Sequence, residues 1–413
     1  MSTVDSKWSC VVLLAGTMAH VITHGFITSF GILFIAIEDT YGGRKAQIAW
    51  ISSIILGCLY LIGSGIGLVF LPTVVSVTVY FDKFRGIACG LALSGCGIGN
   101  LIFSPLTEYL LTEYGLKGTL LLLSGLMLNC IPCCMVYRPL NEKRRSETSK
   151  DHTTEKNQTQ GHKISSRAFD ALLDRNQEEI QDLNEFEQEA GDKFELQQRE
   201  TETAMEKGTN NENAFNINFP PKCSVLTRYV ILMKTKATML FFTSQFFFIV
   251  GAYVPFIFVP DKAKYHGIKE DDSAWILSTI GITSIVGRIV LGSFIDRKFI
   301  DKKILFKMVL ISSGLITVIC SWLNVFWMLV VYAVIYGIMI GTAVSLTSVV
   351  LLDIVGSSCI TDAIGLNYML SGIGGLIGPP LAGTLFDVTS SYSATFLFAG
   401  GSMFVSGLLL TCL

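Results

Sequence analysis

The stretch YFDKFRGIACGLALSGCGIGNLIFSPLTEYL, residues 80–110, joins a basic cluster to a long glycine-rich apolar run. Part of this run occurs twice in the chain. The segment GIGNLIFSPLTEYL, which starts at Gly97, matches GIGGLIGPPLAGTL, which starts at Gly372, at an offset of 275 residues (372 − 97). We therefore predict a duplicated chain that consists of two related halves.

A weaker repeat pairs AWISSII at Ala49 with AWILSTI at Ala274, at an offset of 225 residues (274 − 49). The two offsets differ by 50 residues (275 − 225), so the first half is shorter than the second by that amount between Ile55 and Gly97. One membrane span needs about 20 residues, so two spans with their loops account for this difference. We predict that the first half has lost the equivalent of two helices.

The composition is that of an all-α, polytopic membrane protein surrounded by lipid. Hydrophobic residues make up 51% and charged residues 15% of the 413 residues, and the mean hydropathy is +0.53. A soluble chain of this length is far less apolar. The net charge of −2 gives no sign of a nucleic-acid partner. The cysteines lie mostly inside apolar runs, which is not the pattern of a secreted disulfide framework.

Ten apolar runs are long enough to cross a membrane. Four precede a long polar loop: 11–37, 48–81, 86–111 and 120–137. Six follow it: 229–259, 274–295, 304–323, 325–352, 363–386 and 394–413. The run 48–81 would be about 51 Å long as a straight helix, against a membrane core of about 30 Å. Because Pro72 offers a kink, we predict one bent helix there.

The chain is predicted to have three parts. Residues 1–137 form a shortened N-terminal membrane bundle, 138–228 a polar and largely disordered linker, and 229–413 a C-terminal bundle of six helices. Basic residues at 83–85, 138–145 and 297–303 flank the spans on one side, whereas the opposite loops carry little positive charge, apart from the mixed segment DKAKYHGIKEDD at residue 261. By the positive-inside rule, this side and both termini are cytoplasmic.

Arg288 lies in the middle of the apolar run ILSTIGITSIVGRIVLGSF. An ionisable group at that depth faces a cavity or a partner, and a guanidinium is well shaped to hold a carboxylate through two hydrogen bonds. Substrate-anion binding is one interpretation. The other is a structural salt bridge, for which Glu108 and Asp353 are the candidate acids.

His20 and His24 are four residues apart in the first span and are predicted to share a helix face. Two imidazoles there could relay protons. Hydrogen bonding across a helix interface is an equal alternative. A metal site is not predicted, since further ligands are not evident in the sequence.

Charged residues at the cytoplasmic ends of two spans are candidates for a conformational latch. They are Lys83 and Arg85 before the third run, and Asp296 and Arg297 in the segment GSFIDRK. Neighbouring glycine rows would let helices approach closely.

The sequence shows no phosphate loop, nucleophile elbow or zinc cluster, so we expect neither an enzyme nor a cofactor.

The pattern YFxKxRxxAxGxAxxG over residues 80–95 resembles the fifth-helix signature of the monocarboxylate transporters, a solute-carrier branch of the major facilitator superfamily. Further resemblance is carried by WISSI at residue 50, GRIVLGSFIDRK at 287, LLDIVG at 351 and GIGGLIGPPLAGTLFD at 372. The resemblance implies two helical bundles joined by a long loop. The family has twelve helices, whereas this chain has about ten (4 + 6) and lacks parts of helices two and four and all of helix three.

The resemblance also implies a function. It predicts alternating-access transport of a small organic acid or amino-acid-like substrate across the plasma membrane, either passive or proton-linked, with Arg288 contacting the carboxylate. Ser284 stands where proton-coupled relatives carry an aspartate, and Thr28 aligns with their first-helix lysine, so both are expected at the substrate site. Some relatives require an accessory single-span membrane protein.

Two hypotheses from other classes remain at this stage. With part of the first bundle absent, the chain could be a truncated, non-transporting isoform that acts at most as a regulator or partner of a full-length transporter. A receptor or scaffold that signals through the polar loop is a third reading, supported by that loop alone.

Overall fold

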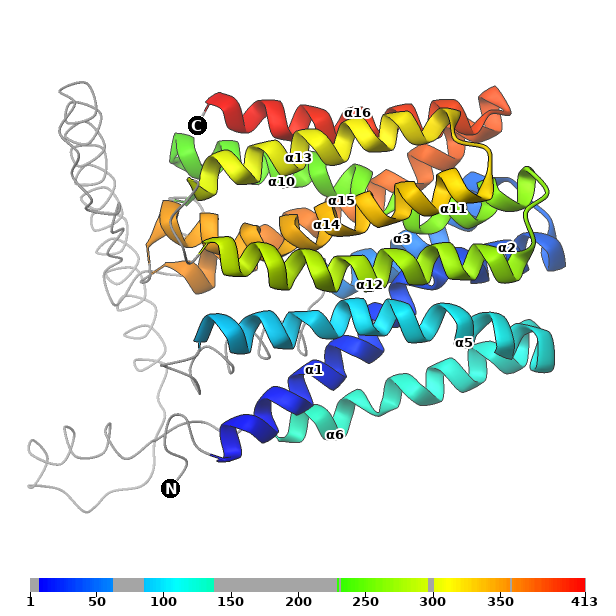
Figure 1. Cartoon of the computed structure of the whole chain (residues 1–413), viewed down its shortest axis with the longest axis horizontal. Helices are drawn as coiled ribbons and strands as arrows, with labels where there is room; N and C mark the ends of the chain where they lie inside the picture. Colours follow the sequence, from blue (N-terminus) through cyan, green and yellow to red (C-terminus); the bar gives the residue numbers. More distant parts are fainter. Residues whose placement is uncertain are drawn as a thin grey trace, which may run out of the picture.

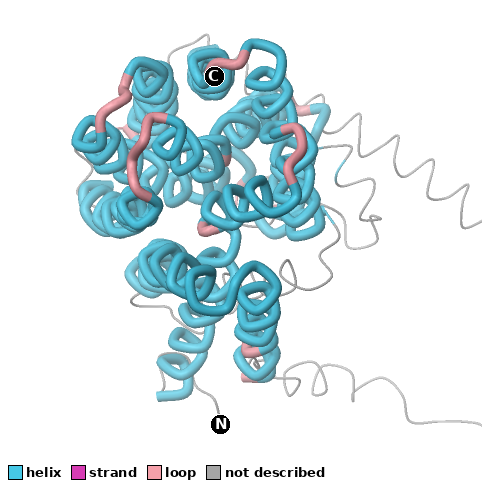
Figure 2. The backbone as a smooth tube through the Cα atoms, turned by 90° about the vertical axis from the view of Figure 1, so that its right-hand side faces the viewer, coloured by secondary structure: helices cyan, strands magenta, loops and turns pink. Residues whose placement is uncertain are grey.

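A computed structural model describes residues 7–61, 85–136, 229, 232–295, 301–356 and 359–412. Every secondary-structure element in these residues is a helix. Figure 1 shows the long helices running side by side, with the start of α1 and the end of α16 at the same end of the molecule. We call the opposite end, where α2 meets α3 and α15 meets α16, the far end. Figure 2 views the molecule from the far end, with the helices nearly end-on.

The first half contains α1 (Lys7–Thr28), α2 (Phe30–Tyr41), α3 (Lys45–Leu61), α5 (Arg85–Leu128) and α6 (Cys130–Met135). Helix α5 is not straight, because Gly115 has φ 62° and ψ 179°. These angles are open to glycine and unfavourable for other residues. The chain reverses there at the far end (Figure 1), which separates the predicted runs 86–111 and 120–137.

The second half contains α10 (Lys236–Ala252), α11 (Val254–Tyr265), α12 (Glu270–Ile295), α13 (Lys302–Ile319), α14 (Phe326–Val355), α15 (Ile360–Thr389) and α16 (Tyr392–Leu409), with short 3₁₀ turns at Cys320–Trp322 and Leu410–Cys412. In the described part of the chain, seven helical stretches are long and apolar enough to span a membrane. The multi-pass, all-α fold is thus confirmed, while the count of ten spans stays a prediction.

Two of these spans are interrupted near their middle. Helices α1 and α2 form one span, Trp8–Tyr41, which breaks at Ser29. Helices α10 and α11 form another, Lys236–Tyr265, which breaks at Tyr253, just before Pro255. The proline lacks a backbone N–H and cannot continue the hydrogen-bond pattern of α10. The two halves therefore share a broken helix as their first element.

Each copy of the duplicated glycine segment packs against a helix of the other half. Helix α5, with the first glycine repeat, packs on α12, and α15, with the second repeat, packs on α3. A Cβ added at Gly97 would lie 2.7 Å from the backbone oxygen of Gly281, and one at Gly383 would lie 2.9 Å from Ala46 Cα. Larger residues do not fit such contacts. The prediction that these glycines allow close helix packing is confirmed at these crossings.

Several sequence predictions fall outside the described residues. They concern Lys83, Asp296, Arg297, the kink at Pro72 and the linker 138–228. Arg85 begins α5, but its side chain also lies outside the described part. The proposed gating roles of these residues and the three-part division of the chain stay predictions.

Candidate functional site

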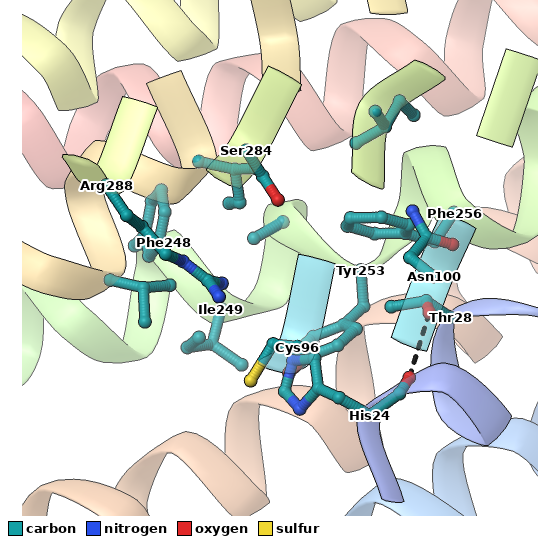
Figure 3. Close-up of a pocket in the computed structure, with 14 residues that line it drawn as sticks. His24, Thr28, Cys96, Asn100, Phe248, Ile249, Tyr253, Phe256, Ser284 and Arg288 are labelled. Atoms are coloured by element: carbon teal, nitrogen blue, oxygen red, sulfur yellow. Dashed lines mark hydrogen bonds between the residues drawn. The ribbon is translucent and has the colours of Figure 1, made fainter. Parts of the chain in front are cut away.

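A small cavity of about 50 Å³ lies between the two halves, near the middle of the spans. Its lining comes from α1, α5, α10, α11, α12 and α14, together with Tyr253 at the break (Figure 3): His24, Thr28, Cys96, Asn100, Phe248, Ile249, Ala252, Tyr253, Phe256, Ile280, Ser284, Arg288, Ile340 and Val344. A volume of this size holds a few water molecules. It is the place where the breaks in α1–α2 and α10–α11 come together.

Arg288 reaches this cavity from α12 and is only 6% exposed. One of its Nη1 hydrogens is donated to the backbone carbonyl of Leu93 in α5, so the side chain bridges the two halves. Its Nε has no hydrogen-bond partner among the described residues. A buried guanidinium with an unused donor is costly unless a ligand or water satisfies it.

Neither acid considered from the sequence serves as a partner for Arg288. Asp353 pairs with Lys302, Nζ to Oδ2, at 3.3 Å. Glu108 lines a different cavity, near the far end, with Asp39 and Glu270. The salt-bridge interpretation of Arg288 therefore receives no support from these two acids.

Thr28 and Ser284 also line the cavity, from opposite halves. Thr28 Oγ1 donates to the backbone oxygen of His24 at 2.8 Å, and Ser284 Oγ donates to that of Gly281 at 2.8 Å. A hydroxyl that donates in this way still has lone pairs with which to accept a hydrogen bond. The structure thus brings the three predicted substrate-contacting residues to one cavity.

The two histidines lie in different surroundings, although both belong to α1. His24 lines the cavity, next to Cys96 and Tyr253 (Figure 3). His20 is fully buried away from the lining, and its Nδ1 lies 2.9 Å from the backbone oxygen of Gly16. A four-residue spacing places two side chains on one face only approximately, because a helix turns 400° over four residues. A role at the cavity is thus open to His24 only.

Sequence reasoning missed Asn100 and the aromatic wall of the cavity. Asn100 Nδ2 donates to the backbone oxygen of Leu277 at 2.8 Å, which ties α5 to α12 about three helical turns from Arg288. Phe248, Tyr253 and Phe256 line the cavity from α10, the break and α11, with Phe248 near Arg288 and Phe256 near Asn100 (Figure 3). One signal was available, since interrupted apolar segments at corresponding positions of two halves mark binding sites in transporters.

Comparison with known proteins agrees with this geometry. Residues 241–413 match the Major Facilitator Superfamily. Monocarboxylate transporter 12 of Mus musculus is 26% identical over 411 residues, which cover 98% of this chain and 76% of the relative. The chain is thus similar to major facilitator superfamily proteins over residues 241–413 and to monocarboxylate transporters over nearly its whole length. Monocarboxylate transporter 9 of Gallus gallus is 24% identical, covering 98% of this chain and 92% of the relative.

Solved structures of POT family transporters share the fold. A POT family transporter in complex with a thioalcohol-conjugated peptide aligns with a TM-score of 0.58 at 11% identity, covering 98% of this chain and 95% of that one. This likeness concerns the fold alone. The predicted fold class is confirmed, and the proteins that this chain resembles are membrane transporters.

Proposed function

We propose that this protein moves a small carboxylate-bearing metabolite across the plasma membrane by alternating access. The observation that carries the proposal is Arg288, a buried guanidinium at a cavity between the halves, whose Nε has no partner among the described residues. A substrate carboxylate would accept from this Nε–H and from an Nη–H, which is the two-point geometry that a guanidinium favours.

The remaining lining residues complete a site for an anion with an apolar body. The hydroxyls of Thr28 and Ser284 supply polar contacts from both halves. The aromatic rings on α10 and α11 supply apolar surface opposite them. Among the described lining residues only Arg288 carries a permanent charge. Its positive charge would balance a single negative charge on the substrate inside the membrane.

The size of the cavity supports alternating access rather than an open channel. A space of about 50 Å³ between the halves is too small to hold a metabolite, so we expect the halves to move apart when a substrate binds. The glycine crossings of α5 with α12 and of α3 with α15 permit two helical surfaces to rock against each other.

Orientation and coupling follow from the same proposal. The basic residues that flank the spans assign the end with both termini to the cytoplasm, so the far end is extracellular. His24 is the side chain at the cavity that we propose would carry a co-transported proton.

The resemblance also implies that an accessory single-span protein could be needed. Co-expression with such a protein tests this, and the measured quantity is the amount of this chain at the cell surface.

The direct test is uptake of a labelled panel of monocarboxylates and aromatic amino acids by cells that express the chain, normalised to surface-biotinylated protein. We expect uptake above that of untransfected cells for at least one carboxylate. Surface protein without uptake of any panel member would favour the truncated, non-transporting isoform, which the comparisons do not support.

Replacing Ser284 by aspartate is expected to make uptake strongly pH-dependent. The new carboxylate lies one helical turn before Arg288 and competes with the substrate for the guanidinium. Protonation removes this competition, so uptake by Ser284→Asp should be low at pH 7.5 and rise as the pH falls. Ser284→Asn is the matched control, since it has no charge to titrate. Equal pH profiles for both variants would contradict the placement of residue 284 beside Arg288.

A further inference from the structure

A second cluster of charges lies at the far end and connects the halves. Lys45, the first residue of α3, places its Nζ 2.8 Å from Glu38 Oε2 and 2.5 Å from Asp261 Oδ2. Glu38 belongs to α2 in the first half, whereas Asp261 belongs to α11 in the second. Lys45 is 8% and Asp261 4% exposed, so this inter-half ion pair is buried.

Aromatic rings surround the same ammonium group. The ring centroids of Phe386, Tyr392 and Phe34 lie 4.9, 5.6 and 5.7 Å from Lys45 Nζ. Phe34 comes from the first half and the other two from the second. Ring faces attract a cation, and rings that exclude water strengthen the ion pair inside them.

The backbone of α3 is held from the other half as well. The carboxylate of Asp387 in α15 accepts hydrogen bonds from the backbone N–H groups of Lys45 and Ala46, each at 3.0 Å. These N–H groups belong to the first turn of α3, where no intrahelical acceptor exists. A Cβ added at Gly383 would lie 2.9 Å from Ala46 Cα, so α15 directly abuts this turn.

A reciprocal pair lies next to the first. Lys264 of α11 pairs with Asp39 of α2 and, at 2.9 Å, with Glu270 of α12. Each half thus presents a cation to an acid of the other half. The more buried of the two inter-half pairs is that of Lys45 with Asp261.

Two short helices connect this cluster to the central cavity. Helix α2 starts directly after the break beside Thr28 and carries Glu38 near its end, and α11 starts after Tyr253 and carries Asp261. The two helices touch along the way, since a Cβ added at Gly31 would lie 2.2 Å from the backbone oxygen of Phe256. The path from the far end to Arg288 is closed along this contact.

We propose that the buried ion pair of Lys45 with Asp261 is the latch of the extracellular gate. Opening the far end must pull α2 and α3 away from α11 and α15. This movement separates the Lys45 side chain from Asp261 and from the rings of Phe386 and Tyr392, and it breaks the hydrogen bonds from the start of α3 to Asp387. Opening takes Asp261 away from its cation, while Lys45 keeps Glu38 within its own half, so the attraction between Lys45 and Asp261 favours the closed state until the site is occupied. This inference rests on the orientation and the alternating access of the proposed function.

Cys96, which lines the cavity, is a natural reporter of gate opening. Intact cells are treated with a membrane-impermeant thiol reagent, and labelling per surface protein is measured for each variant. The chain has 11 cysteines, so the Cys96-specific rate is the difference from the same variant that also carries Cys96→Ser. We expect Lys45→Met and Asp261→Asn each to raise this rate by about tenfold or more over the wild type.

Two comparisons make the test specific. Lys302→Met removes a cation whose partner, Asp353, belongs to the same half, and it should label at the wild-type rate. Lys45→Arg keeps a cation between Glu38 and Asp261 and should label more slowly than Lys45→Met. Wild-type labelling rates in both single variants at normal surface abundance would overturn the latch. Labelling needs no substrate, so this outcome is distinct from a failure to transport.

Discussion

Replacing Arg288 by glutamine is expected to lower uptake per surface protein by at least about 100-fold, because the substrate carboxylate loses its charged partner in a desolvated site. Glutamine keeps hydrogen-bonding capacity and a long side chain, and it removes the cost of burying a charge. We therefore expect normal surface abundance of Arg288→Gln. The measurement is uptake of the carboxylate identified in the panel, at several concentrations, normalised to surface-biotinylated protein.

Arg288→Lys is the matched control for charge without fork geometry. An ammonium is a point charge and cannot present two parallel N–H donors, so this variant should retain part of the uptake with weaker apparent affinity. Equal loss of uptake and of surface protein in all Arg288 variants would instead show that the guanidinium supports folding through its hydrogen bond to Leu93.

Replacing Gly281 by leucine is expected to destabilise the contact between the halves next to the cavity. A Cβ at this position would lie 2.8 Å from the backbone oxygen of Gly97 and 2.9 Å from the backbone nitrogen of Leu101. Backbone atoms cannot yield as a flexible side chain can, so α5 and α12 must move apart. Such overpacking costs about 1–3 kcal/mol. We expect a lower unfolding temperature of the purified protein and reduced uptake.

Gly401 supplies the control for this substitution. It lies in α16, where an added Cβ meets nothing within 4 Å, so Gly401→Leu should leave both quantities near their wild-type values. If Gly281→Leu behaved like Gly401→Leu, then close contact at the α5–α12 crossing would not be required for the fold or for transport.

The architecture could largely be predicted from the sequence because repetition and composition are global signals. The repeats at Gly97 and Gly372 predicted two halves, and the structure packs the four repeat-bearing helices in crossed pairs. Arg288 stood out because a charge inside an apolar run is expensive. The fold class, the glycine crossings and the grouping of Thr28, Ser284 and Arg288 followed from these observations.

Contacts between residues far apart in the chain could not be predicted in this way. Lys45 and Asp261 are 216 positions apart, and each sits at a span end, where a charged residue is ordinary. Only the packing of α2 and α3 on α11 and α15 buries them together. The same holds for the aromatic wall, because phenylalanines in an apolar span do not reveal which face meets a cavity.

Local geometry also set limits on the prediction. The four-residue spacing of His20 and His24 suggested a shared role, yet the exact rotation of α1 leaves only His24 at the cavity. The break at Ser29 has no proline to mark it, in contrast to the break before Pro255. Small backbone deviations of this kind depend on tertiary packing.

The central claim is that this chain itself exchanges a carboxylate through a site built around Arg288. Counterflow in proteoliposomes tests it most directly: purified protein is reconstituted, the vesicles are loaded with the unlabelled carboxylate, and transient accumulation of the labelled compound is followed. We predict accumulation that the matching uncharged amide neither drives nor competes with, and its loss in Arg288→Gln. Absence of counterflow for every carboxylate tested, with folded wild-type protein in the vesicles, would contradict the account.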